Sequence, residues 1–233
     1  MHYTHPLYEV FPPRQADAIQ LYSMNTPNGI KVASALEEMG LAYEPHLINI
    51  LKGDQHTPAF AALNPNGKIP AIIDPNGSED EAVTLMESCA ILLYLAEKSG
   101  KFMPDDNEGK RLCQQWLFFQ AAHIGPMFGQ FGHFYKFATE TCDHPYPVNR
   151  YTQECKRLLG VLDKQLEQRV FMLGSDYSIV DMSIYPWVNT LVGFYEARDH
   201  IGFDDYPAVE RWLQKCIARP ASIKAQTVCA LSH

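Results

Sequence analysis

The chain has 233 residues, of which 46% are hydrophobic and 20% are charged, and its formal net charge is -8. This length is long for one ordinary domain and short for three, so we expect two domains, each with enough apolar residues for a packed core. No run of Lys or Arg occurs in the sequence. The composition therefore argues against nucleic-acid binding through phosphate neutralisation, which needs a basic patch.

Two segments could be mistaken for export or membrane signals. The first 20 residues contain prolines and charges where a secretory signal needs an apolar core, so we expect an extended arm over residues 1–18 and no signal peptide. The uncharged run Leu112–Tyr135 includes four Gln, two His, three Gly and Pro126. This polarity favours a kinked helix buried in protein over a membrane span.

The six cysteines, at positions 89, 113, 142, 155, 216 and 229, show neither C-x-x-C spacing nor a regular period. A chain of this size folds without disulfides, so we expect reduced thiols and a cytoplasmic protein. Cys142, His144 and Cys155 match no standard zinc spacing. We therefore expect no bound metal.

The first hundred residues alternate between strand and helix patterns. Ile19–Tyr22 is a short apolar run, a turn-rich segment follows, and residues 30–39 carry apolar residues at helical spacing before Gly40. Further strands are expected at 43–50, 71–73 and 82–86, with a short helical connection at 58–63 and a helix after Ser88. This order predicts an α/β, thioredoxin-like domain over residues 19–100.

A segment rich in Gly, Pro and Asp, residues 99–109, indicates the domain boundary. Beyond it the sequence shows only helical patterns, which predict an all-α domain over residues 107–226. Helices are expected at 107–137, with an interruption near Gly125-Pro126, and at 148–169, 178–198 and 208–218. Ser178-x-x-Asp181 resembles a capping box with a structural role.

The stretch Asn66–Lys98 holds the features that point to a ligand. Ile69-Pro70 precedes a short strand, and Ser88 is expected to be the N-cap of the next helix, where a hydroxyl and free N–H groups attract an anion. A cis Ile69-Pro70 bond would turn the Ile69 backbone outward beside Glu87 and Ser88. Such a site suits a small peptide with a free α-carboxylate, although Ser88 could equally do no more than cap its helix.

These motifs resemble the glutathione-binding half of the glutathione transferase superfamily. The resemblance covers residues 19 to 220, and further segments fall in the family's order: Thr26-Pro27-Asn28-Gly29, Lys52-Gly53-Asp54-Gln55, Gln115–Phe118, Gly132–Tyr135, Asn149-Arg150-Tyr151 and Tyr177–Asp181. The sequence is most similar to the bacterial nu class (YghU-like), which is associated with disulfide reduction more than with conjugation. The resemblance implies a homodimer that uses glutathione, and it implies neither a metal, nor nucleic acid, nor a membrane as partner.

The resemblance also implies the residues that bind glutathione. Glu87 would pair with the ligand's amine and Ser88 with its α-carboxylate, while the other implied binding positions are Thr26, Asn28, Lys52, Gln55, Ile69 and Arg150. Arg150 matches a position in the helical domain that binds a carboxylate. His133 and Tyr135 are expected to line the same cleft, although a His among aromatic residues is more often simply packed.

The thiolate of glutathione should lie at the end of the first strand. The segment from Ser23 to Gly29 contains no Cys, so it cannot form the mixed disulfide of a glutaredoxin-like mechanism. Thr26 and Asn28 are hydrogen-bond donors at a helix N-terminus, which favours thiolate over thiol, although the same residues could serve only to cap the helix.

The nu-class resemblance implies two glutathione molecules that lie sulfur to sulfur. One thiolate would attack a substrate disulfide and the second glutathione would resolve the mixed disulfide, without a protein cysteine. One alternative is a conjugating transferase or a peroxidase that holds the thiolate with Thr26, Ser23 or Tyr22. Another is a non-catalytic binding module on the same fold.

Overall fold

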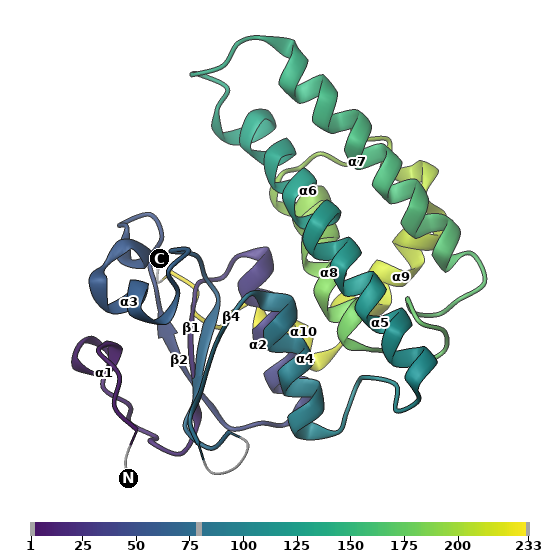
Figure 1. Ribbon diagram of the computed structural model, residues 1–233. Helices are drawn as coiled ribbons and strands as arrows, with labels where there is room; N and C mark the ends of the chain where they lie inside the picture. Colours follow the sequence, from purple (N-terminus) through teal and green to yellow (C-terminus); the bar gives the residue numbers. More distant parts are fainter. Residues whose placement is uncertain (1–2, 78–80, 232–233) are drawn as a thin grey trace. The chain divides into compact units, whose positions relative to one another are not determined.

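The computed structural model describes residues 3–77 and 81–231. The chain divides into two compact units: unit 1 comprises the described residues of Met1–Lys101 and Pro220–His233, and unit 2 comprises Phe102–Arg219 (Figure 1). The sequence analysis assigned residues up to 226 to the helical domain. In the structure, α10 (Pro220–Ala225) instead packs on helix α2 (Pro27–Met39) of unit 1.

Unit 1 is built on a four-stranded mixed sheet with strand order β2-β1-β3-β4. The strands β1 and β2 are parallel, while β3 is antiparallel to both β1 and β4; the strands are β1 (Ile19–Ser23), β2 (Tyr43–Leu47), β3 (Ala71–Asp74) and β4 (Val83–Met86). The predicted thioredoxin-like order is confirmed. The predicted second strand is too long, because the backbone turns at Asn49, whose side chain accepts a hydrogen bond from Leu51 N–H.

Helices cover both faces of this sheet. In Figure 1, α1 and α3 lie on one side, and α2, α4 and α10 lie on the other. The helices of unit 1 other than α10 are α1 (Leu7–Val10), α2 (Pro27–Met39), the short helix η1 (Asp54–His56), α3 (Pro58–Leu63) and α4 (Ser88–Ser99). Helix α2 ends at Gly40, which adopts the left-handed conformation (φ 70°) that glycine tolerates without strain.

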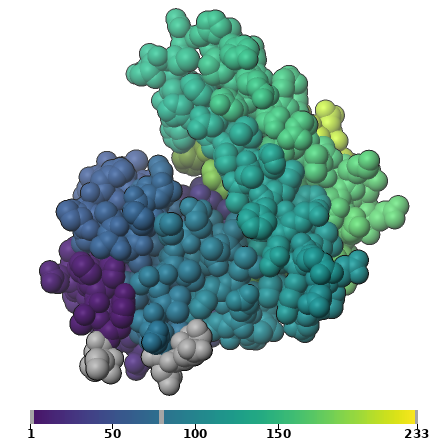
Figure 2. Space-filling view, viewed as in Figure 1, coloured from purple at the N-terminus to yellow at the C-terminus, as the bar shows by residue number. Residues whose placement is uncertain are grey.

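The sequence predicted an extended N-terminal arm, but the structure shows that the arm includes helix α1. Its Leu7 is buried in the core formed with Tyr22, Phe60 and other residues, and Tyr8 and Phe11 pack against that core. Figure 2 shows the start of the chain, in purple, lying against the neighbouring surface of unit 1. Burying the Leu7 side chain contributes about 2 kcal/mol toward holding the arm against the sheet.

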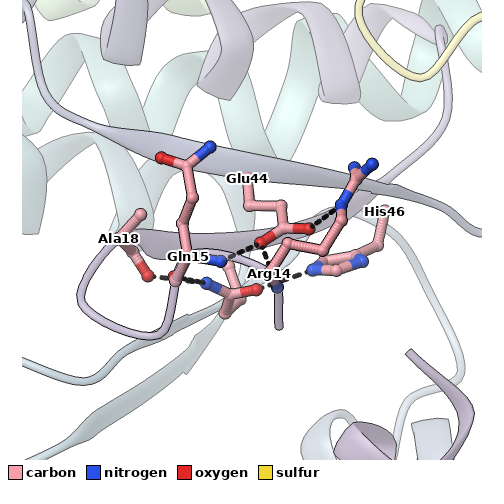
Figure 3. Close-up of polar contacts among 6 residues, drawn as sticks. Arg14, Gln15, Ala18, Glu44 and His46 are labelled. Atoms are coloured by element: carbon pink, nitrogen blue, oxygen red, sulfur yellow. Dashed lines mark hydrogen bonds and ion pairs between the residues drawn. The ribbon is translucent and has the colours of Figure 1, made fainter. Parts of the chain in front are cut away.

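A buried carboxylate holds the arm to the edge strand β2 (Figure 3). Glu44 is 2% exposed, and its oxygens accept hydrogen bonds from Arg14 N–H (2.8 Å), Gln15 N–H (2.9 Å) and Arg14 Nε (2.8 Å). Burial alone would raise the pKa of Glu44. The hydrogen bonds from Arg14 and Gln15 outweigh burial, so the pKa lies below its ordinary value.

The neighbouring His46 ring is oriented by Gln20. The Gln20 amide nitrogen donates to the carbonyl oxygens of Gln15 and Ala18, so its amide oxygen faces His46 Nε2 at 2.7 Å. His46 must therefore donate from Nε2, which fixes its tautomer. Burial lowers the pKa of His46 below its ordinary value.

Unit 2 confirms the predicted all-α domain. Its helices are α5 (Asn107–Phe119), α6 (Gly125–Gly132), α7 (Pro145–Leu166), α8 (Ile179–Asn189) and α9 (Pro207–Ile217), with π-helical turns η3 (Gln120–Ile124), η4 (His133–Phe137) and η5 (Thr190–Phe194) and the short helix η6 (Phe203–Asp205). The interruption expected near Gly125-Pro126 is the π turn η3. Pro126 lacks the N–H of a regular helix, and a π turn accommodates that loss.

The capping box of α8 is formed as predicted, and it is part of the core of unit 2. Asp181 is fully buried and accepts hydrogen bonds from Ser178 N–H, Met172 N–H and Trp212 Nε1. One carboxylate therefore joins the start of α8 to the segment before it and to α9.

Within the described ranges, no helix has the length and apolar character needed to cross a membrane.

The Glu44 contacts predict a stability that depends on pH. We expect Glu44→Ala to lower the free energy of unfolding by about 1–3 kcal/mol at pH 7, because it removes three hydrogen bonds to a charged group. Because the pKa of Glu44 is depressed in the folded state, its contribution is present above its unfolded pKa and is lost as the pH falls through the folded pKa. Urea unfolding followed by far-UV circular dichroism at pH 7, 5 and 3 measures both effects.

Arg14→Ala is the matched control for this prediction. The Arg14 side chain is 82% exposed, and its loss leaves the two backbone hydrogen bonds to Glu44 in place. We therefore expect Arg14→Ala to cost less than about 1 kcal/mol. A difference between the wild type and Glu44→Ala that grows as the pH falls would contradict the assignment.

Candidate functional site

The strand register brings four segments of unit 1 to one end of the sheet. Tyr22 of β1 lies opposite Ala71 of β3, and Ala71 lies opposite Met86 of β4. In the parallel pair, Ser23 of β1 lies beside Leu47 of β2. The loops that follow β1, β2 and β4 and the loop that precedes β3 therefore meet at the same end, and these loops and the helices η1, α2 and α4 that start there carry all seven predicted binding residues of unit 1.

Thr26 is the N-cap of α2 and is half-buried. Its hydroxyl oxygen accepts a hydrogen bond from Gly29 N–H at 3.3 Å. A hydroxyl that accepts one hydrogen bond still has its own proton to donate. Thr26 therefore caps the helix, as the alternative interpretation held, and can also donate to an anion at the helix N-terminus, where Asn28 is half-buried in the first turn.

Gly29 allows α2 to start close to the loop that precedes it. A side chain at this position would collide with the carbonyl oxygen of Met24. Any larger residue would therefore push the N-terminus of α2 away from the end of β1. The glycine in Thr26-Pro27-Asn28-Gly29 is required by this close approach.

The C-terminal segment anchors the loop before Thr26, a contact that the sequence analysis missed. Asn25 N–H donates to Cys229 O at 3.1 Å, and the Asn25 side-chain amide donates to Gln226 O. Asn25 and Gln226 are 201 positions apart in the sequence. No local pattern could reveal the pairing.

Ser88 is not the N-cap of α4, which corrects the prediction. Glu87 is the N-cap, with φ 66°, and its carbonyl oxygen accepts the first helical hydrogen bond from Ile91 N–H at 2.9 Å. Ser88 is the first helical residue, so its hydroxyl is not needed as a cap. The hydroxyl instead accepts a hydrogen bond from Lys31 Nζ at 3.2 Å.

Lys31 is a second feature that the sequence analysis missed. It lies on α2 among buried apolar residues and is only 1% exposed. Burial lowers the pKa of Lys31 from 10.5 to about 8, although the nearby Cys89 and Glu87 act in the opposite direction. Burying this ammonium costs the fold about 3 kcal/mol at neutral pH. Its position on the buried face, between Ile30 and Val32, was the signal in the sequence.

Gln55 presents a buried acceptor toward the loop after β2. Its amide nitrogen donates weakly to Ile50 O at 3.4 Å, while its amide oxygen is buried without a hydrogen-bond partner among the described residues. An unsatisfied buried acceptor is costly, and a ligand that brings an N–H group would remove the cost. Lys52 of the same loop is exposed.

Ile69 and Glu87 complete the group in unit 1. The Ile69-Pro70 peptide bond is cis, and Ile69 is half-buried at the edge of the core that holds the N-terminal arm. Glu87 is exposed. Thr26, Asn28, Lys52, Gln55, Ile69, Glu87 and Ser88 are thus gathered at one end of one sheet.

The other predicted residues belong to unit 2. Arg150 is exposed on α7, and its guanidinium lies 3.8 Å from Glu154 on the same helix. Tyr135 stacks on Phe131 (4.8 Å between ring centroids) and lies beside His200. His133 is exposed. The contacts of Tyr135 favour packing, while the roles of His133 and Arg150 stay predictions.

Two residues proposed as alternative thiolate partners are inaccessible. Tyr22 is fully buried under the N-terminal arm, where burial raises the pKa of its phenol. Ser23 is 2% exposed, and its hydroxyl donates to Met24 O at 3.3 Å. Of the three hydroxyl groups considered, only that of Thr26 can reach a ligand.

The described residues contain no group of three His, Cys, Asp or Glu side chains placed to hold a metal ion. Chemically, the sheet end offers hydroxyl and backbone donors at two helix N-termini, a buried ammonium behind one of them, and an exposed carboxylate. This set can bind a small molecule that carries both a carboxylate and an amine, with a second anionic group at Thr26.

The fold and this site define a two-domain protein that binds a small anionic ligand at the end of a thioredoxin-like sheet. Residues 26–98 match the family model described as the glutathione S-transferase N-terminal domain, and residues 145–215 match that of the glutathione S-transferase C-terminal domain. The chain is 41% identical over 231 residues to the disulfide-bond oxidoreductase YghU of Escherichia coli K12, covering 96% of this chain and 79% of that protein. The chain belongs to the glutathione transferase family.

Two solved structures are closely similar to the chain. A glutathione transferase from Burkholderia graminis with two glutathione molecules bound per subunit has a TM-score of 0.94 and 49% identity, over 95% of this chain and 92% of that one. A glutathione transferase from Pseudomonas putida with one glutathione disulfide bound per subunit has a TM-score of 0.93 and 47% identity, over 96% of both chains.

The unsatisfied oxygen of Gln55 predicts opposite effects on stability and on binding. We expect Gln55→Met to leave the unfolding temperature of the ligand-free protein unchanged or higher, because it removes a buried acceptor without a partner. The same substitution should weaken glutathione binding about tenfold, the loss of roughly one hydrogen bond. Thermal unfolding and calorimetry measure the two effects.

Gln214→Met, on the exposed face of α9, is the matched control, and it should change neither quantity. A Gln55→Met protein that is less stable without ligand but binds glutathione as the wild type does would show that Gln55 has a structural role only.

Proposed function

We propose that this protein is a glutathione-dependent disulfide-bond reductase that binds two glutathione molecules per subunit and uses no protein cysteine. The observation that carries the proposal is the sheet end itself. It gathers the Thr26 hydroxyl, the Gln55 acceptor and the Ser88 hydroxyl around a segment, Ser23–Gly29, that contains no Cys.

The reaction consists of two exchanges of sulfur partners. The thiolate of the first glutathione attacks a substrate disulfide, forming a glutathione–substrate mixed disulfide and releasing one substrate thiolate. The thiolate of the second glutathione then attacks the glutathione sulfur of that mixed disulfide, forming glutathione disulfide and releasing the other substrate thiolate. The two thiol protons of glutathione go to the two products, and the substrate gains two electrons.

Thr26 and Asn28 are proposed to hold the attacking thiolate. Their donors lie at the N-terminus of α2, where the helix dipole also favours negative charge, so they lower the fraction of unreactive thiol. Glu87 is proposed to bind the ligand's amine and Ser88 its α-carboxylate. Gln55, the Ile69 backbone and Lys52 are proposed to bind the rest of the tripeptide, and Arg150 a carboxylate of the second glutathione.

The cysteines of unit 1 are poor nucleophiles. Burial raises the pKa of the Cys229 thiol to about 12, and burial also raises the pKa of Cys89, although Lys31 opposes this effect. The thiolate is the reactive form of cysteine, so the raised pKa values make both thiols less reactive than a free cysteine. This supports a reaction in which both sulfur nucleophiles come from glutathione.

The relatives support the same proposal. YghU of Escherichia coli is a disulfide-bond oxidoreductase. The Burkholderia graminis protein holds two glutathione molecules per subunit, and the Pseudomonas putida protein holds glutathione disulfide, which is the product of the proposed reaction. We also propose, from the family resemblance, that the protein is a homodimer and acts in the cytoplasm.

Binding stoichiometry is the first test. Calorimetric titration should give two reduced glutathione molecules per subunit, or one tightly bound glutathione disulfide. One reduced molecule per subunit with weak binding of the disulfide would favour a conjugating transferase instead. A protein that binds neither form would favour a non-catalytic module on this fold.

Asn28→Ala tests the proposed sulfur site. We expect about a hundredfold loss in the rate of reduction of a small disulfide such as hydroxyethyl disulfide, because one donor to the reacting thiolate is removed. The fold should survive, as judged by far-UV circular dichroism. Unchanged activity in Asn28→Ala would exclude this role.

Asn76→Ala is the matched control, because Asn76 lies at the opposite end of β3 and its amide donates to Asp17 O. We expect it to keep full activity.

A wild-type protein that turns over an aryl halide or a hydroperoxide faster than it reduces a disulfide would support the conjugating or peroxidase alternative.

A further inference from the structure

Lys31 is the buried ammonium of α2, and burying a charged group is energetically unfavourable. The side chain is only 1% exposed, and burial disfavours its charged form. A buried charge is retained where it serves a partner or a ligand. Neighbours of its Nζ include Ser88 and Cys89 on α4 and Glu87, the N-cap of α4.

The contact with Ser88 determines what that hydroxyl can do. Lys31 has three N–H donors and no acceptor, so in the 3.2 Å contact Ser88 must be the acceptor. A serine hydroxyl has a single proton, and that proton is then left to donate. Its neighbour within the protein is the thiol of Cys89, which is a weak acceptor. A carboxylate is a far stronger one.

The local charges define which group binds best at Ser88. Glu87 is exposed and is suited to a cation, whereas Ser88 has the Lys31 ammonium directly behind it. An α-amino acid group carries an amine and a carboxylate on the same carbon. Its amine would face Glu87 and its carboxylate Ser88, in the one orientation that pairs opposite charges.

We propose that Lys31 is a positioning residue that makes this end of the site selective for a free α-carboxylate, by holding the Ser88 hydroxyl as a donor and by supplying the positive charge behind it. The inference rests on the proposed function, because the ligand is the γ-glutamyl end of glutathione. It adds a residue that does not itself touch the ligand. Selectivity for the charged carboxylate over a neutral group of the same shape is its distinguishing consequence.

The test compares two ligands that differ only in this charge. Reduced glutathione and the analogue whose γ-glutamyl α-carboxylate is replaced by a carboxamide are titrated into the full-length protein by calorimetry. We expect the wild type to prefer glutathione by at least about tenfold, as for a hydrogen bond to a charged group. In Lys31→Met this preference should fall about tenfold, through weaker binding of glutathione and little change for the carboxamide.

Lys101→Met is the matched control. Lys101 Nζ donates to Met39 O at the other end of α2, at 3.0 Å, so this variant removes a lysine hydrogen bond within the same unit. It should keep the wild-type preference. In disulfide reduction, Lys31→Met should raise the KM for glutathione while kcat at saturating glutathione stays within about threefold of the wild type, because uniform binding and not the chemical step is affected.

Ser88→Ala tests whether Lys31 acts through the hydroxyl. If it does, adding Lys31→Met to Ser88→Ala should change the ligand preference less than Lys31→Met does alone. If Lys31→Met changes the ligand preference equally in the wild type and in Ser88→Ala, Lys31 does not act through the Ser88 hydroxyl and the proposal is overturned.

Stability separates this role from a structural one. Removing a costly buried ammonium should leave the unfolding temperature of the ligand-free protein unchanged or higher, for Lys31→Met and for Lys31→Gln alike. The proposal would be overturned if Lys31→Met and Lys31→Gln were both unfolded. It would also be overturned if Lys31→Met bound glutathione and its carboxamide analogue more weakly by the same factor.

Ligand binding by the wild-type protein tests the proposed function and the role of Lys31 separately. If it binds neither ligand, the proposed function fails. If it binds both ligands equally well, glutathione binding stands and only the role of Lys31 is overturned.

Discussion

The register between the central strands of unit 1 is the constraint on which the candidate site depends. Pairing of Tyr22 with Ala71, and of Ala71 with Met86, places the end of β1, the start of β3 and the end of β4 at one edge. The N-termini of α2 and α4 then open toward the same place. A shift of one residue would turn the strands' side chains to the opposite faces and separate the donors from one another.

The two faces of this sheet are stabilised in different ways. One face is covered by α2 and α4, with Lys31 as a buried charge between them. The other carries Gln20, Glu44 and His46 beneath the N-terminal arm, where Glu44 accepts three hydrogen bonds and Gln20 fixes the His46 ring. The buried side chains of Lys31, Gln20 and Glu44 each have specific partners, which ties the sheet's stability to one arrangement of the arm and of the helices.

The chemistry of the site follows from where charge is stabilised. The pKa values of the cysteines of unit 1 are raised, which disfavours their thiolates, while Thr26 and the N-terminus of α2 favour a thiolate that a ligand brings. The protein thus supplies donors and orientation, and glutathione supplies the sulfur. A tightly packed fold can keep its own thiols inert and still support disulfide exchange, because the reactive groups arrive with the co-substrate.

The sequence by itself determined the order of strands and helices and the family, and it predicted the two-domain division near residue 100 and the ligand-binding segments at Thr26-Pro27-Asn28-Gly29 and Glu87-Ser88. These features depend on local periodicity, on turn and cap residues, and on motifs that lie within a few positions of each other. Ser88 shows the limit of such reasoning, because the sequence marked the residue but assigned its hydroxyl to the wrong partner.

Only the tertiary structure decided that Lys31 donates to Ser88, that Glu44 holds the arm, and that the segment around Cys229 anchors Asn25. Each of these contacts joins residues 29 or more positions apart. Whether a polar side chain is buried, and which partner then satisfies it, depends on what packing brings beside it, and no local pattern contains that information.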